Sequence, residues 1–103
     1  MNDKAVTYVV AFDISKFTER RFFMKLSKTV EMMNSKDYKE RFKAEYYQLE
    51  NRCNGLKTML EKWDNGTLEF TPTCPREIYD RQLKAMEDYA QVLDERAEIE
   101  GIF

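Results

Sequence analysis

Two runs of apolar side chains, each with alternating spacings of four and three residues, limit what this 103-residue chain can fold into. Such spacing places the side chains on one face of an α-helix, and a face that repeats over several turns packs against another helix. We call these two faces the seam; its members are Phe42, Tyr46, Leu49, Cys53, Leu56, Leu60 and Trp63, then Tyr79, Leu83, Met86, Ala90, Leu93 and Ala97. The connection runs only from Asp64 to about Cys74. The sequence therefore predicts a mainly α fold, a long antiparallel helical hairpin over residues 36 to 100.

The ends of the two predicted helices carry residues that favour helix termination and initiation. Gly66 and Gly101 are suited to the left-handed backbone that ends a helix. Pro75 is suited to the first turn of the second helix, and Thr73 or Cys74 is expected at its cap.

The first 35 residues have a different pattern. Apolar residues alternate with others from Ala5 to Ile14, which predicts a strand. A helix is expected from about Lys16 to Met33, and Ser35 is placed to cap the helix that follows. We therefore expect a strand and helix extension at 1–35 and the hairpin at 36–103, within one compact unit.

A second apolar set lies outside the seam. Its members are Ala44, Tyr47 and Met59 on the first hairpin helix and Ile78, Tyr89, Val92 and Ile99 on the second. Two helices cannot bury both sets, so the second set must meet the N-terminal elements, a symmetry mate, or both. A single strand also has no partner strand within the chain, and a homo-oligomer is the expected state.

Composition excludes several function classes. The chain has no histidine and only three glycines, so zinc chemistry and glycine-rich phosphate loops are not supported. A net charge of −2 argues against a nucleic-acid partner. The carboxylates Asp94, Glu95, Glu98 and Glu100 are expected on a solvated helix face. The sequence indicates a protein that is not an enzyme, needs no cofactor, does not span a membrane and resides in a reducing cytoplasm.

The connection between the helices carries the candidate ligand site. Trp63, Phe70 and Tyr79 present rings for stacking on a base, while Thr71, Thr73 and Arg76 lie beside the free amides of a helix N-terminus and Lys62 adds charge. The alternative is structural, with Glu77 occupying those amides and Trp63 closing the hairpin. A second candidate set lies on the helix expected from Lys16 to Met33, where basic residues that include Arg20 and Arg21 alternate with aromatic residues. The alternative is that the aromatic rings of this helix pack in the core.

Three stretches resemble a widespread family of short tailed-phage proteins named after an open reading frame of a crAss-like phage. They are YKERFKAEY at 38–46, EKWDNGTLEFTPTCP at 61–75 and QLKAMEDYAQVLDERAEIEG at 82–101. Members of that family usually begin near the position of Met33, so residues 1–32 are an addition. The hairpin is also similar in architecture to phage sponge proteins that counter CBASS and Thoeris immunity, which hold nucleotides between subunits.

These resemblances imply a phage anti-defence protein in the host bacterial cytoplasm. It is expected to bind and sequester a cyclic nucleotide or ADP-ribose-derived immune signal without cleaving it. The alternative is a protein-binding module that inhibits a host immune protein or serves phage assembly, because the second apolar set suits a protein partner equally well.

Overall fold

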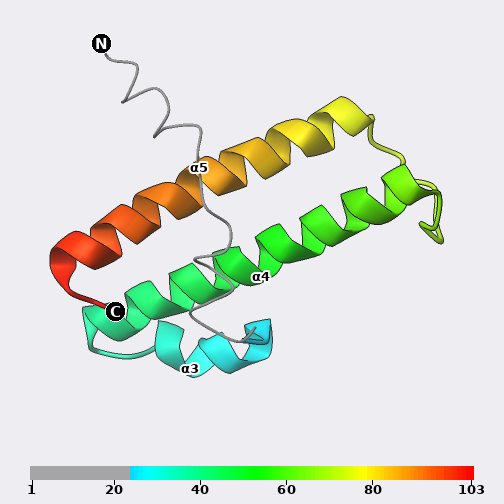
Figure 1. Ribbon diagram of the computed structural model, residues 1–103. Coiled ribbons are helices and arrows are strands. Elements are labelled where there is room, and N and C mark those ends of the chain that lie inside the picture. The colour runs from blue at the N-terminus through cyan, green and yellow to red at the C-terminus, as the bar shows by residue number, and fades with distance from the viewer. Residues whose placement is uncertain (1–23) are drawn as a thin grey trace, which may run out of the picture.

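The computed structural model describes residues 24–103, and within that range every regular element is helical. A 3-10 turn η1 (Leu26–Thr29) leads into the short helix α3 (Val30–Met33), followed by the two long helices α4 (Tyr38–Asn65) and α5 (Arg76–Glu100). Figure 1 shows α4 and α5 side by side and antiparallel, with α3 against the first half of α4. The predicted hairpin is confirmed, whereas the strand expected at 5–14 lies outside the described residues.

Both long helices end at the glycines that the sequence indicated. Gly66 has φ 74° and Gly101 has φ 64°, the left-handed conformation that glycine adopts without a steric penalty. Beyond each glycine the chain turns back, since the amides of Thr67 and Ile102 donate to the carbonyls of Lys62 and Ala97, both at 2.9 Å. These bonds satisfy carbonyls that a helix end leaves without partners.

The helix starts differ from the prediction. The cap of α4 is Asp37, whose side chain accepts from the Lys39 amide at 2.9 Å, while Ser35 lies before it and accepts from the Asp37 amide at 3.0 Å. The N-cap residue of α5 is Pro75 itself, so the expectation of Thr73 or Cys74 there was wrong. Proline has no side-chain acceptor, and α5 therefore begins without a capping side chain.

The prediction of a continuous helix from Lys16 to Met33 was also wrong for the part that the structure describes, from residue 24 on. The backbone of Lys25 is extended, and only a 3-10 turn and one short helix follow it. The carbonyl of Met24 instead accepts from the Asn51 side-chain amide of α4 at 3.2 Å. Thr29 Oγ1 accepts from Gln48 Nε2 at 2.9 Å. Tertiary bonds to α4 have replaced the local bonds of a longer helix.

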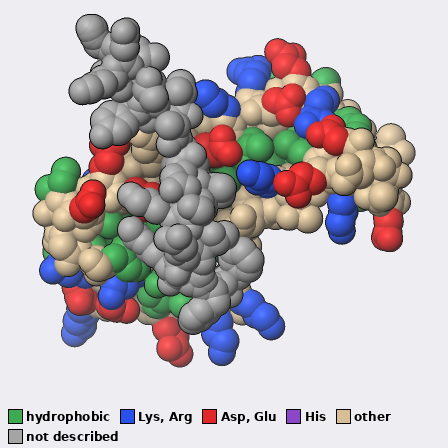
Figure 2. Space-filling model, viewed as in Figure 1, with side chains coloured by type: hydrophobic (Ala, Val, Ile, Leu, Met, Phe, Trp, Pro, Cys, Tyr) green, Lys and Arg blue, Asp and Glu red, His purple; other side chains and the backbone are tan. Residues whose placement is uncertain are grey.

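The core lies at the open end of the hairpin, where the first half of α4 meets the second half of α5. It comprises Phe42, Tyr46, Leu49, Ala90, Leu93, Ala97 and Ile102. Nearer the connection, Cys53 and Leu60 are buried, but Leu56 and Leu83 are only half-buried. Figure 2 shows hydrophobic side chains reaching the surface between the two long helices, among charges of both signs. Packing along the seam is therefore uneven.

A buried hydrogen bond crosses this core. The Tyr46 hydroxyl donates to Asp94 Oδ1 at 2.9 Å, and both residues are buried. The expectation of a solvated Asp94 was wrong, because helical spacing alone did not reveal a tyrosine opposite it. The Phe103 ring covers Tyr46 from the C-terminus at 4.9 Å between centroids. A polar pair inside a core fixes the register of the two helices, since slippage by one turn would bury both groups without partners.

The second apolar set divides between the two helices. On α4, Ala44 is buried, and Tyr47 is half-buried with its ring 6.0 Å from that of Phe103. On α5, Ile78, Val92 and Ile99 remain exposed. The chain therefore covers the α4 part of the set and leaves the α5 part open.

Removal of the Tyr46 hydroxyl tests the buried pair. We expect Tyr46→Phe to lower the free energy of unfolding by about 1–2 kcal/mol, because the ring stays packed while a buried carboxylate loses a donor. Urea unfolding followed by circular dichroism measures this change. Tyr38→Phe removes a hydroxyl at an exposed position and should leave stability unchanged; equal effects of the two substitutions would contradict the role of the pair.

The two thiols provide a second test of the packing. Burial, with Glu87 nearby, raises the pKa of the Cys53 thiol from 9.0 to about 11, although Lys57 acts in the opposite direction. Cys74 is half-exposed in the connection. Since the thiolate is the reactive form, a thiol reagent at about pH 8 should modify Cys74 quickly and Cys53 only after denaturation. Cys74→Ser should abolish the fast phase; two fast thiols in the native protein would show that the seam is open at Cys53.

Candidate functional site

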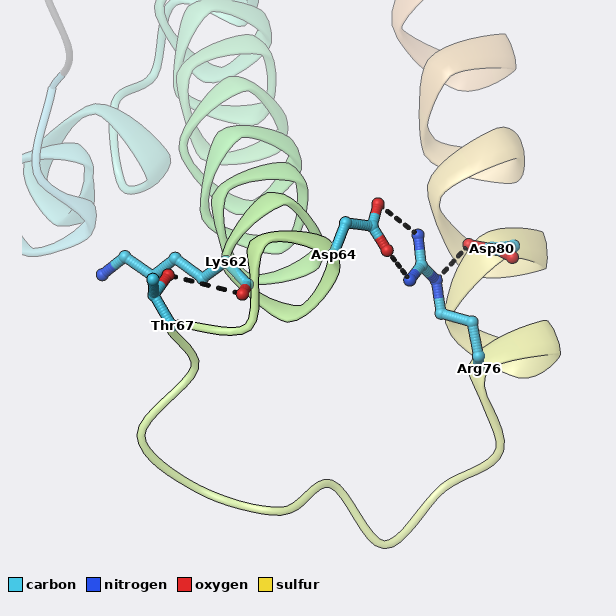
Figure 3. Close-up of polar contacts among 5 residues, drawn as sticks. All are labelled: Lys62, Asp64, Thr67, Arg76 and Asp80. Atoms are coloured by element: carbon cyan, nitrogen blue, oxygen red, sulfur yellow. Dashed lines mark hydrogen bonds and ion pairs between the residues drawn. The ribbon is translucent and has the colours of Figure 1, made fainter.

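The connection is held by a single guanidinium between two carboxylates. Arg76, the first residue of α5, donates to Asp64 at the end of α4 through Nη1 at 2.6 Å and Nη2 at 3.3 Å. Its Nε donates to Asp80, one turn further along α5, at 2.8 Å. Figure 3 shows the three side chains pointing toward one another across the gap between the helix ends. Arg76 thus ties the two helices together where apolar packing is thinnest.

These contacts fix the charge states of the cluster. The hydrogen bond from Arg76 is the main reason that the Asp64 pKa lies below its ordinary value, and the two carboxylates raise the pKa of Arg76 in turn. The carboxylates are more than half exposed, so solvent screens the pairs and they contribute little to global stability. Their effect is on local geometry, because a two-pronged contact fixes the plane of the guanidinium.

Aromatic side chains surround this cluster. The Arg76 guanidinium lies over the Trp63 ring at 5.2 Å, and Tyr79 meets the same ring edge-on at 6.0 Å. Beside Trp63 an open pocket of about 280 Å³ is lined by Trp63, Gly66, Leu68, Phe70, Thr71 and Pro72. Phe70 is 58% exposed although it is a large apolar side chain. The connection therefore presents ring faces and a hydroxyl toward solvent.

The structure brings together part of the predicted site. Trp63, Phe70 and Thr71 line one pocket, and Arg76 and Tyr79 contact Trp63 from outside it. The remaining candidates lie apart: Thr73 is exposed outside the pocket lining, Lys62 points away from Arg76 on the other side of α4, and Arg20 and Arg21 fall outside the described residues.

Sequence reasoning missed the two partners of Arg76. The contact with Asp80 has the i,i+4 spacing of a helical ion pair and was available from the sequence. The contact with Asp64 spans twelve positions and depends on how the connection folds, which no local pattern specifies. The cluster changes the expected role of Arg76, since its charge is already compensated within the chain.

Comparison with known proteins gives the chain a family. A model of the Sequestin family matches residues 36–99, which is more than half of the chain and almost the whole hairpin. The chain therefore belongs to the Sequestin family, and the matched range agrees with the range over which the sequence resembles phage hairpin proteins. The family name indicates binding rather than catalysis. Searches of curated proteins and of solved structures found no match.

Two further features concern the described residues alone. None of their helices is both long and apolar enough to cross a membrane. None of their cysteine and carboxylate side chains gathers into a group of three that would hold a metal ion.

The only tryptophan of the chain reports on the Arg76 cluster. Because the Asp64 pKa is lower in the folded protein than its ordinary value of 3.8, the stabilisation from this pair is complete above that pH. It is lost as the pH falls through the folded-state pKa. We expect Trp63 fluorescence to change in this acid range, and Asp64→Asn to show the altered emission already at neutral pH.

Asp88→Asn is the matched control, since Asp88 pairs with Lys84 and has no part in the Arg76 cluster. This variant should titrate like the wild type. Circular dichroism recorded alongside separates a local change from loss of the helices. Identical acid titrations for the wild type and Asp64→Asn would show that the cluster does not control the environment of Trp63.

Proposed function

We propose that this protein binds a nucleotide immune signal at the connection between α4 and α5 and sequesters it without cleaving it. The observation that carries the proposal is the open pocket lined by Trp63, Phe70 and Thr71 in a member of the Sequestin family. The exposed Phe70 ring and the half-buried Trp63 ring lie beside the Thr71 hydroxyl. Such a set suits a purine, which stacks on aromatic faces and accepts hydrogen bonds at its edge.

Burial and charge suggest how the ligand lies. The pocket of about 280 Å³ is large enough for one base but not for a whole dinucleotide, so the sugar and phosphates would extend outside it. The Arg76 guanidinium contacts the Trp63 ring and is therefore the cation that a phosphate beside this ring would meet. A phosphate reaching Arg76 has to displace Asp64 or Asp80, which favours a ligand with more than one negative charge.

The groups that line the site favour retention over cleavage. Hydrolysis of a phosphodiester requires a bound metal or a positioned base and nucleophile. The pocket lining offers rings, a proline, a leucine and one hydroxyl. Phage origin and a host cytoplasmic location belong to the same proposal, and they rest on the resemblance to phage proteins.

Calorimetric titration with a panel of cyclic nucleotides and ADP-ribose derivatives tests the proposal. We expect one member to bind and to be recovered intact after denaturation of the complex. Phe70→Ala should weaken binding about tenfold, the loss expected for one stacking contact. Tyr38→Ala is the control, because Tyr38 is a similarly exposed ring at the other end of the hairpin.

Two outcomes would contradict the proposal. One is the absence of heat and of any thermal shift with every member of the panel, and stoichiometric capture of a host immune protein by the same sample would then favour the protein-binding alternative. The other is binding that Phe70→Ala and Tyr38→Ala weaken equally, which would exclude the connection as the site.

A further inference from the structure

Every seventh residue of α5 from position 78 is apolar and exposed. We call these residues the α5 row; they are Ile78, Ala85, Val92 and Ile99. The exposed fractions are 39% for Ile78, 53% for Val92 and 83% for Ile99. The row spans most of α5, about 32 Å at the rise of an α-helix.

The hairpin does not account for this row. The side of α5 that faces α4 carries Ala90, Leu93 and Ala97, and the row lies roughly 130° further round the helix. Single exposed apolar residues are ordinary, but four at strict seven-residue spacing are the pattern of a helix that packs along another helix. A fully solvated face has no physical need for such a repeat.

We propose that the α5 row is the contact surface for a second copy of this chain. The two α5 helices lie antiparallel about a two-fold axis between Ala85 and Val92. Ile78 of each copy then faces Ile99 of the other, and Ala85 faces Val92. The small central alanine allows the helices to approach closely while the isoleucines fill the ends. The surface is complementary to itself, as a two-fold interface requires.

The charges beside the row specify this direction. Arg81, Asp88 and Glu95 form an adjacent row, also at seven-residue spacing and exposed. Antiparallel pairing brings Arg81 of one copy opposite Glu95 of the other, at both ends of the contact. Parallel pairing would place Arg81 against Arg81 and Glu95 against Glu95, which is repulsive.

The centre of the contact is compatible with the same arrangement. The two Asp88 side chains approach each other near the axis, and each is bound to Lys84 of its own helix at 2.9 Å, which compensates its charge. Arg81 and Glu95 form no ion pair with any residue in the described range, and both are available to a partner. Two helices of this length bury on the order of 1,000 Å² together, which is at the lower end for specific interfaces and typical of weak association.

Sedimentation equilibrium of the full chain over a concentration series tests the surface. We expect a monomer–dimer equilibrium that Val92→Glu weakens at least about a hundredfold, because each dimer would bury two uncompensated carboxylates. Val30→Glu is the matched control, since Val30 on α3 is 51% exposed and lies outside the row. A chain that stays monomeric throughout the series, or equal effects of the two substitutions, would overturn the proposal.

Charge exchange tests the direction of pairing. Arg81→Glu and Glu95→Arg should each weaken association several-fold, and the double variant should return to within about twofold of the wild type. In a parallel pair each of these positions would face the same position of the other copy. Neither single substitution would then remove an attractive contact, and the double variant would not associate more tightly than the single variants. Failure of the double variant to recover association would overturn the antiparallel geometry.

Discussion

The buried hydrogen bond between Tyr46 and Asp94 sets the register on which the rest of the hairpin depends. Apolar seams are permissive, because a shift by one heptad replaces one set of aliphatic contacts by a similar set. A tyrosine hydroxyl and a carboxylate in the same core are not interchangeable with leucine, and a shifted pairing would leave both without their bond. The register then decides which residues of α4 and α5 meet at the connection, and so places Asp64 within reach of Arg76.

Uneven packing along the seam gives the two ends of the hairpin different properties. The open end combines a dense core with the returning C-terminus, where Ile102 is buried and Phe103 covers Tyr46. The end with the connection relies on solvent-exposed ion pairs and ring contacts around Trp63. Such contacts are worth little in free energy, and regions of this kind open at low cost. The ligand site proposed at that end benefits, because a base can enter without disrupting the core.

The hairpin could be predicted from the sequence because the apolar spacing of four and three residues repeats along both helices. A single position that departs from this spacing does not change the prediction. Gly66 and Gly101 were equally readable, since left-handed backbone strongly favours glycine. What failed depended on partners distant in sequence. The Asn51 side chain donates to the Met24 carbonyl, which was expected to form a hydrogen bond within the first helix. Asp94 is buried in the core, where it accepts from the Tyr46 hydroxyl. Of the candidate site residues, Trp63 and Phe70 line one pocket, whereas the Lys62 side chain points away from Arg76 on the other side of α4.

The proposed two-fold contact has a consequence for sequestration. Antiparallel pairing along α5 sends the two connections to opposite ends of the dimer, separated by about the length of the helix. Each site is then formed by one chain alone, and the second copy acts on it only through its contact with the α5 helix of that chain. Arg76 lies two residues before Ile78 of the row, and Asp80 lies two residues after it. Fixing Ile78 against Ile99 of the second copy restrains the turn that carries Arg76, so dimerisation lowers the entropy that ligand binding would otherwise have to remove.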